Sequence, residues 1–302
     1  MRLIILNSLA HIHFAGVESP RRSLTPKPLV VRWLRPVSLR SRLDAGAAPL
    51  DPFGAWLLSR AGLDVGAYRA AAVQRRFGAC LRQLRVPTTD AARNLLERNP
   101  ELLPRALNTL LIGVTEFFRD RTVFDYLRGV ALPALLKTRP GLRVLSAGSS
   151  EGHELYSMAM LLAETRRLEN SFLQGIDCRP AAIARARRGE FEMKDIAHLE
   201  PRWRDVYFQR EGLRCFILPE LRARTVWRVD DLLSFQERDL WDIILFRNVA
   251  IYLNESHSTK AWSQWVSNLA PGGYLVTGKA ERPSGSLTLE RVAPGIYRKA
   301  ML

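Results

Sequence analysis

Residues 143–154 read Arg-Val-Leu-Ser-Ala-Gly-Ser-Ser-Glu-Gly-His-Glu, an apolar run followed by a turn between two glycines. The apolar run predicts a short strand, and the apolar positions that continue through Leu162 predict a helix after the turn. A strand that leads into a helix through glycines opens a Rossmann-like βαβ unit, in which a ligand binds at the carboxyl end of the strand. The spacing is Gly-x-x-x-Gly, from Gly148 to Gly152, rather than the Gly-x-Gly-x-x-Gly of dinucleotide-binding proteins.

Two carboxylates, Glu151 and Glu154, fall at the start of this predicted helix. The N-terminus of a helix attracts anions, so these side chains help to cap the helix, but they would repel a pyrophosphate. They also leave negative charge facing the predicted pocket, which favours a cationic ligand. S-adenosylmethionine, which carries a sulfonium and an ammonium and no phosphate, is the cofactor that this pattern favours.

The next predicted strand covers residues 172–177 and ends in Asp177. An acidic residue at this place in a Rossmann-like fold binds the ribose hydroxyls of the cofactor. A second interpretation remains open, in which the two glycines form an ordinary strand-to-helix turn and Asp177 only caps the helix that follows Arg179-Pro180.

The chain has 302 residues, which is long enough for an α/β domain and a smaller domain. Its formal net charge at pH 7 is +15. The positive charge favours an acidic partner, but it does not choose among nucleic acid, an anionic membrane and an acidic protein surface. No apolar run approaches the roughly 20 residues that span a bilayer, so we predict no membrane insertion and expect a cytoplasmic protein. The cysteines at 80, 178 and 215 form neither a disulfide framework nor a zinc motif.

Composition and periodicity divide the chain into three parts. Residues 1–52 carry several prolines and arginines with little periodicity, and we expect a poorly ordered leader in which His11 and His13 hold no metal. Residues 53–112 predict a small all-α domain. Residues 113–302 predict an α/β domain, interrupted at 193–224 by short strands that indicate an antiparallel insertion.

Apolar residues recur at helical spacing over 68–84, which predicts one helix. Arg75, Arg82 and Arg85 fall on another face of it, and periodicity alone favours a solvated basic face. Further helices are predicted at about 88–96 and 102–111. After the insertion we expect strands at 226–229, 241–246 and 274–277, a helix at about 261–269 and a hairpin over 289–299.

Several motifs follow one another in a fixed order along the chain. They are Val-Thr-Glu-Phe-Phe-Arg at 114–119, Ser-Ala-Gly at 146–148, Ser-x-Gly-x-Glu-x-Tyr-Ser at 150–157, Asp177, Arg-Asn-Val-x-Ile-Tyr at 247–252 and Pro-Gly-Gly-Tyr-Leu at 271–275. In this order the sequence resembles the chemotaxis receptor methyltransferases, the protein-glutamate O-methyltransferases of the CheR type, from about Phe53 to the C-terminus. The resemblance implies an α/β fold, with a small all-α domain before a Rossmann-like S-adenosylmethionine-dependent methyltransferase domain that carries a small antiparallel β insertion.

The resemblance also implies cofactor-binding residues by position. Glu154 is expected to hold the methionine ammonium and Asp177 the ribose, while Asp231 and Leu232 are expected near the adenine. The expected set is Gly113, Thr115, Arg119, Gly148, Gly152, Glu154, Asp177, Asp231, Leu232, Arg247 and Asn248.

The catalytic residues that the resemblance implies are Arg119, Arg247 and Tyr252. Two guanidinium groups and a hydroxyl can orient a substrate carboxylate through charge-assisted hydrogen bonds. A glutamate side chain, with a pKa of about 4.3, is already ionised at neutral pH and needs no general base. Structural ion pairs for the two arginines, and helix packing for the tyrosine, remain the alternative interpretations.

The implied activity is the formation of glutamate methyl esters on a chemoreceptor or a related signalling protein, with S-adenosylhomocysteine as product. In the family, an arginine-rich face of the helical domain binds the acidic helical cytoplasmic region of the receptor, and Arg75, Arg76, Arg82 and Arg85 fall there. We expect a monomer. We expect no nucleic-acid partner, because the chain has neither an Asn/Asp-Pro-Pro-Tyr motif nor a catalytic Pro-Cys pair.

Four positions depart from the family pattern. Gly113 stands where Asn is usual, Glu151 and His153 alter the glycine turn, and Asp231 replaces an Asn. These departures leave a second function open, that of a catalytically degenerate module. Such a module would bind S-adenosylmethionine or its product and act in signalling by protein–protein contact.

Overall fold

The computed structural model describes residues 49–111, 115–236, 239–285 and 287–301. Most of the expected leader, with His11 and His13, lies outside the described residues, as does the predicted cofactor residue Gly113. The first described helix, α1 (Pro52–Arg60), is capped by the Asp51 side chain, which accepts a hydrogen bond from the backbone N–H of Phe53 at 2.9 Å.

The helical part packs on its own apolar core. After α1 it comprises η1 (Val65–Ala67), α2 (Ala70–Gln74), α3 (Phe77–Leu84), α4 (Thr89–Arg98), η2 (Pro100–Leu102) and α5 (Leu103–Leu110). The prediction of one helix over 68–84 is wrong, since α2 ends before Arg76 and Tyr68 is extended and pairs with Leu253 in an antiparallel bridge. This long-range pairing outweighs the local helical pattern.

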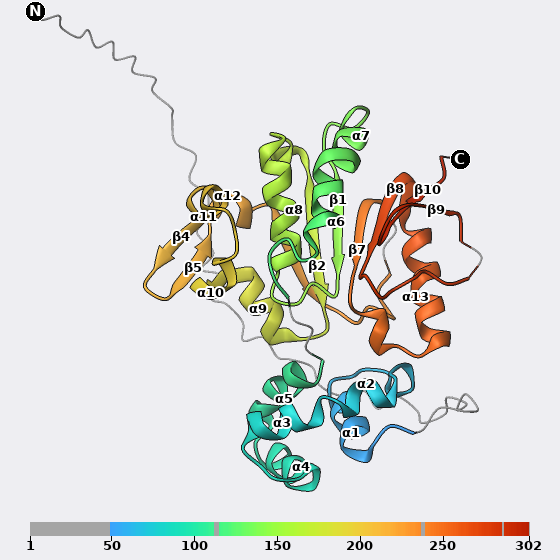
Figure 1. Cartoon of the computed structure of the whole chain (residues 1–302). Coiled ribbons are helices and arrows are strands. Elements are labelled where there is room, and N and C mark those ends of the chain that lie inside the picture. Colours follow the sequence, from blue (N-terminus) through green and yellow to red (C-terminus); the bar gives the residue numbers. More distant parts are fainter. Residues whose placement is uncertain (1–48, 112–114, 237–238, 286, 302) are drawn as a thin grey trace, which may run out of the picture. The chain divides into compact units, whose positions relative to one another are not determined.

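Among the described residues, seven strands form one sheet in the order β6-β2-β1-β7-β8-β10-β9 (Figure 1). The first five in this order are parallel, and β10 runs antiparallel to both of its neighbours, β8 and β9. From β1 the chain winds outward to β2 and β6, then crosses to β7 on the other side, so a topological switch point lies between β1 and β7. The strands are β1 (Arg143–Ala147), β2 (Phe172–Asp177), β6 (Thr225–Val229), β7 (Trp241–Phe246), β8 (Leu269–Thr277), β9 (Leu289–Ala293) and β10 (Ile296–Lys299).

Helices cover both faces of this sheet, and two apolar cores result. Successive side chains of β1 show the division, because Val144 joins the core that includes α8 whereas Leu145 joins the core that includes α13. The remaining elements of this part are α6 (Arg121–Tyr126), η3 (Leu127–Ala131), α7 (Leu132–Leu136), α8 (His153–Glu164), η4 (Leu168–Asn170), α9 (Pro180–Arg188), η5 (Ala250–Tyr252) and α13 (Glu255–Ser267).

The predicted antiparallel insertion is present as a second sheet with the order β3-β5-β4, but this sheet begins at Glu190, before the predicted bound of 193. Its strands are β3 (Glu190–Glu192), β4 (Phe208–Glu211) and β5 (Arg214–Ile217), and it also holds α10 (Met193–Ile196), α11 (Pro201–Tyr207) and α12 (Pro219–Arg222). The sequence did not indicate these three short helices. Phe191 and Phe208 anchor the insertion, since both pack edge-on against Phe117 in the core that includes α8.

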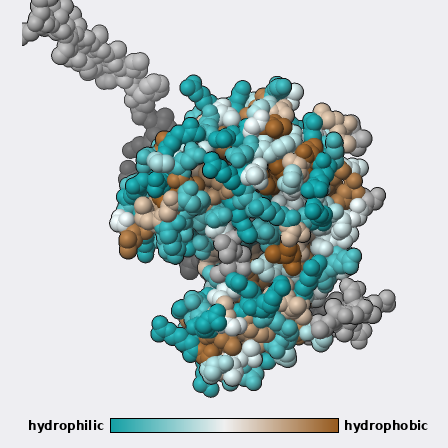
Figure 2. Space-filling model, in the orientation of Figure 1, coloured by the Kyte–Doolittle hydropathy of each residue, from teal (hydrophilic) through white to brown (hydrophobic). Residues whose placement is uncertain are grey.

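The face drawn in Figure 2 is mostly hydrophilic, with hydrophobic residues in small separated patches. Within the described residues, no helix combines the length and the apolar content that crossing a bilayer requires.

Candidate active site

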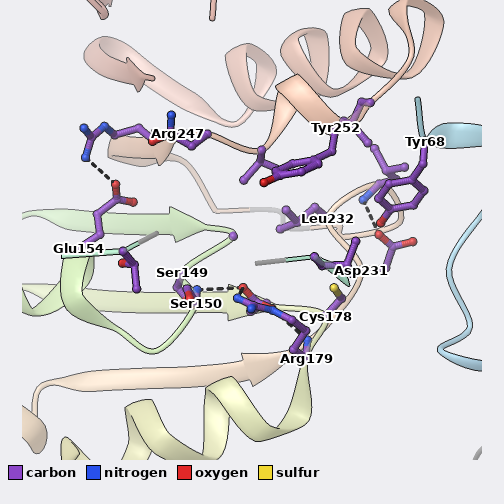
Figure 3. Close-up of a pocket in the computed structure, with 18 of the residues that line it drawn as sticks. Tyr68, Ser149, Ser150, Glu154, Cys178, Arg179, Asp231, Leu232, Arg247 and Tyr252 are labelled. Atoms are coloured by element: carbon purple, nitrogen blue, oxygen red, sulfur yellow. Dashed lines mark hydrogen bonds and ion pairs between the residues drawn. The ribbon is translucent and has the colours of Figure 1, made fainter. Parts of the chain in front are cut away.

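A pocket opens at the carboxyl ends of the parallel strands, beside the switch point between β1 and β7. Figure 3 shows Arg247 and Glu154 at one end of it, and Tyr68 and Asp231 at the other. The predicted site residues that line it are Thr115, Arg119, Gly148, Glu154, Asp177, Asp231, Leu232, Arg247, Asn248 and Tyr252.

Backbone conformation and close packing require glycine at both ends of the turn that follows β1. Gly148 has φ +84° and lines the pocket, and a Cβ there would lie 2.5 Å from Cγ2 of Val249. Gly152 has φ +97° and would clash with the ring of Trp227, at 2.8 Å. Gly152 is not among the residues that line the pocket, so the structure assigns it a packing constraint in place of the predicted cofactor contact.

Glu154 is held by two donors at its end of the pocket. The Ser146 hydroxyl donates to Oε1 at 2.9 Å, and Nη1 of Arg247 donates to Oε2 at 2.9 Å. Arg247 also pairs with Asp120, Nη2 to Oδ2 at 2.7 Å, and its side chain is only 2% exposed. Burial raises the pKa of Asp120, but the hydrogen bond from Lys279 and the charge of Arg247 outweigh burial and lower that pKa overall.

Asp177 is held more completely than Glu154. The backbone N–H of Ser150 donates to Oδ2 at 2.8 Å, and Arg179 donates from its backbone N, Nε and Nη2 at 3.0, 2.9 and 3.1 Å. Both side chains are buried, and the neighbouring carboxylate raises the pKa of Arg179 even though burial opposes the charge. Asp177 thus ends its strand as predicted, but it is already bonded within the chain.

The loop that follows β7 carries Asn248 and Tyr252 into the pocket. Asn248 has φ +60°, and the buried carboxylate of Glu281 accepts from the N–H groups of Asn248, Gly278 and Ile251 at 2.7, 2.8 and 3.3 Å. Burial raises the pKa of Glu281, although these backbone donors partly oppose the rise. Sequence reasoning missed Glu281, which no motif marks.

The helical part supplies a further wall of the pocket through Tyr68. Two backbone hydrogen bonds at 2.8 Å fix this wall to the Tyr252 loop, from Arg69 N to Tyr252 O and from Asn254 N to Ala67 O. Burial, with the nearby Cys178 and Asp231 charges, raises the pKa of Tyr68 well above its usual range. Sequence reasoning missed Tyr68 because it placed the residue inside a core-facing helix.

At the Tyr68 end the pocket becomes more apolar. Leu232 and Val249 present aliphatic surface beside Tyr252, and Oδ1 of Asp231 accepts from the N–H of Leu233 at 3.1 Å. Burial raises the pKa of Asp231. The sequence also missed Ser149, Ser150, Cys178, Arg179 and Val249 as lining residues.

Three buried polar atoms in the pocket wall have no hydrogen-bond partner among the described residues. They are Oγ of Ser149, Nε of Arg247 and Oδ1 of Asn248. Buried polar atoms of this kind are normally satisfied, so a polar ligand is the partner they fit. With Glu154 at one end and apolar surface at the other, the residues suit the ammonium and the adenine of S-adenosylmethionine. No group of three or more His, Cys, Asp or Glu residues placed to hold a metal occurs in the described ranges.

The predicted partner-binding arginines lie around α3. Arg75, Arg82 and Arg85 are exposed, whereas Arg76 is half-buried and its Nε is buried. The structure therefore leaves three of the four available to a partner.

The mostly parallel sheet, its switch-point pocket and the acidic pocket end define an S-adenosylmethionine-dependent methyltransferase. The sequence model described as "CheR methyltransferase, SAM binding domain" matches residues 113–295. The chain therefore belongs to the CheR methyltransferase family, as the order of its motifs predicted, and S-adenosylmethionine is its cofactor.

Two relatives that are similar over most of their length agree with this assignment. The chain is 31% identical to a chemotaxis protein methyltransferase of Listeria monocytogenes over 73% of its own length and 85% of the relative. It is 29% identical to the putative methyltransferase Cher3 of Pseudomonas putida, over 77% of this chain and 90% of that one. Among solved structures, the N-methyltransferase NodS of Bradyrhizobium japonicum with bound S-adenosylhomocysteine aligns at 21% identity and a TM-score of 0.32, over 53% of this chain and 63% of NodS.

Proposed function

We propose that this methyltransferase esterifies glutamate side chains in the acidic helical cytoplasmic region of a chemoreceptor or a related signalling protein. The observation that carries the proposal is the common pocket formed by Glu154, Arg119 and Tyr252, residues that lie far apart in the sequence. Relatives named as chemotaxis protein methyltransferases support the receptor as substrate.

The chemistry of the lining residues suits a carboxylate acceptor. No histidine is present among the described residues that line the pocket. A carboxylate with a pKa of about 4.3 needs no base, because it is ionised before it reaches the site. S-adenosylmethionine, when bound, supplies an electrophilic methyl group on a sulfonium.

Arg119 and Tyr252 are the side chains that we assign to the acceptor. A guanidinium and a phenol can hold a carboxylate by charge-assisted hydrogen bonds and align one oxygen for attack. The reacting charges neutralise each other in the transition state, so the contribution of the protein is alignment and exclusion of water.

We assign Arg247 a positioning role in place of direct substrate contact. Its Nη atoms are bonded to Glu154 and Asp120, and Nη2 also donates to the carbonyl of Arg119 at 2.9 Å. The buried guanidinium of Arg247 thereby positions both Glu154, the expected ligand of the ammonium, and the backbone of Arg119, which we assign to the acceptor.

The receptor would dock on the exposed arginines Arg75, Arg82 and Arg85. An acidic helical surface complements this cluster, and a protein acting on such a receptor region works in the cytoplasm. We expect a monomer to be sufficient, because the described residues of one chain line the whole pocket.

The test is to incubate the full-length protein with methyl-labelled S-adenosylmethionine and the purified cytoplasmic fragment of a receptor encoded beside it. We expect label on the receptor that base treatment releases as methanol, the behaviour of a methyl ester. Binding of S-adenosylhomocysteine with no base-labile label would reject the proposal and favour the degenerate signalling module. The observation that favours this second candidate is that Asp177, the expected ribose ligand, is already hydrogen-bonded within the chain.

A further inference from the structure

We propose that Glu281 is a positioning residue for methyl transfer, which holds Tyr252 in place against the acceptor carboxylate. Glu281 does not line the pocket, and it acts on Tyr252 through the backbone of residues 248–251. The inference rests on the proposed function, because it concerns the side chain that we assign to the acceptor.

The first step is the hydrogen bonding of the Glu281 carboxylate. Oε2 accepts from the backbone N–H groups of Asn248 and Gly278 at 2.7 and 2.8 Å. Oε1 accepts from the backbone N–H of Ile251 at 3.3 Å. Glu281 is only 4% exposed, so water does not compete with it as the acceptor of these donors.

The second step is the place of two of these donors in the loop. Asn248 and Ile251 lie just before Tyr252, which ends the short turn η5. The backbone N–H of Tyr252 donates to the carbonyl of Val249 at 3.0 Å, so its position follows that of residues 248–251. Asn248 has φ +60°, which is unfavourable for a residue other than glycine, and the bond to Glu281 stabilises this conformation.

The third step is that the chain after Tyr252 is held independently. The carbonyl of Tyr252 accepts from the backbone N–H of Arg69 at 2.8 Å, and the backbone N–H of Asn254 donates to the carbonyl of Ala67 at 2.8 Å. The helical part thus fixes the backbone that follows the tyrosine ring. Glu281 fixes the backbone that precedes it.

The fourth step is that this role requires a carboxylate. Both oxygens of Glu281 accept from backbone N–H groups, and a glutamine would turn its NH₂ group toward at least one of these donors. Two donors that face each other cannot bond, so at least one backbone N–H loses its acceptor in Glu281→Gln. The substitution keeps the size of the side chain, and it therefore removes the anchor with little change in packing.

The experiment measures turnover of the full-length protein on the receptor fragment with methyl-labelled S-adenosylmethionine. Both substrates are saturating, so that their affinities do not enter the measured rate. The variants are Glu281→Gln, Tyr252→Phe and the double variant, with Glu290→Gln as the matched control. Glu290 is an exposed glutamate of β9 that does not line the pocket.

We expect Glu281→Gln to lower turnover about fivefold, the loss of one hydrogen bond to the acceptor. In the Tyr252→Phe background the same substitution should lower turnover less than about twofold, because the hydroxyl that it positions is already absent. Glu290→Gln should match the wild type. A purely structural role of Glu281 would instead lower turnover by the same factor in both backgrounds.

Wild-type turnover in Glu281→Gln, or an equal loss in both backgrounds, would overturn the inference. Wild-type protein that transfers no methyl group would refute the proposed function, and the inference with it, so the two failures are distinguishable. Thermal melting of each variant checks folding. If Glu281→Gln does not fold, Gly278→Ala replaces it with the same two outcomes, because a Cβ at residue 278 would lie 2.7 Å from Oε2 of Glu281 and displace it.

Discussion

Two of the carboxylates that line the pocket, Glu154 and Asp177, are each bonded to an arginine, but they differ in how many acceptor positions remain open. Glu154 accepts from Arg247 and Ser146, which use two of its acceptor positions, whereas all four positions of Asp177 are filled. Glu154 therefore keeps acceptor positions for an ammonium, whereas a ligand hydroxyl could donate to Asp177 only where one of its present donors moves. A residue of the expected type at the expected position does not by itself define a ligand contact.

Removing the arginine at the Glu154 end should have the largest effect. Arg247→Met removes the buried cation that the half-buried Glu154 and Asp120 share, although Asp120 keeps Lys279, and breaking a buried ion pair lowers the free energy of unfolding by about 3 to 5 kcal/mol. Urea unfolding of the variant and of Arg188→Met measures the difference. A loss no greater than that of the exposed control would show that this pair is as weak as a surface pair.

Removing the carboxylate at the same end should mainly affect ligand affinity. Glu154→Gln should weaken S-adenosylhomocysteine binding about 10- to 100-fold, because a charge-assisted bond to the ammonium is lost. Glu151→Gln is the matched control, since Glu151 pairs with Arg185 and does not line the pocket. Unchanged affinity in Glu154→Gln would remove the distinction between the two carboxylates.

Acid should destabilise the core behind this part of the pocket, because His153, the residue before Glu154 in α8, packs against Phe117 and Phe191. Burial lowers the pKa of His153 to about 3, and neither ring nitrogen has a hydrogen-bond partner among the described residues. Below the ordinary value of 6.5 the unfolded chain binds the proton and the folded chain does not, so stability falls as the pH falls. This histidine should lower the free energy of unfolding by about 1.4 kcal/mol per pH unit, or about 2 kcal/mol between pH 6.5 and about 5.

Urea unfolding across this pH range, for the wild type and for His153→Leu, tests the assignment. The leucine variant should lose that part of the slope. Identical slopes in the two proteins would mean that His153 is protonated in the folded state.

The smallest effect is expected at Tyr252, which lines the same pocket. Tyr252→Phe should lower turnover about fivefold, the loss of one hydrogen bond to the acceptor, and leave S-adenosylhomocysteine affinity unchanged. Tyr126→Phe, outside the pocket, is the control for label transfer to the receptor. Wild-type turnover in Tyr252→Phe would assign the ring to packing only.

The position of the site could be predicted from the sequence, because the ends of the buried strands can be located in it. The apolar run before Gly148 and the run that ends at Asp177 fix two neighbouring parallel strands, and the Arg-Asn-Val-x-Ile-Tyr motif follows a third. Carboxyl ends of parallel strands meet at one edge, so the convergence of these residues could be predicted.

What the sequence could not show is which side chains bond to one another there. The sequence places Arg179 just before a helix, but it does not show that the Arg179 side chain folds back and donates to the carboxylate of Asp177. The extended conformation of Tyr68 depends on pairing with Leu253, nearly two hundred residues later, which no local pattern encodes. Glu281 is buried where it accepts from the N–H groups of the Asn248 loop, more than thirty residues earlier in the chain, and no local pattern predicts this contact.

The two backbone hydrogen bonds that tie residues 67 and 69 to the Tyr252 loop bear on any attempt to redirect this enzyme. Exchanging the helical part for that of another relative, in order to change the receptor, would replace one wall of the reaction chamber at the same time. A functional chimera should therefore keep residues 64–69 with their own methyltransferase domain and join the foreign helices beyond them.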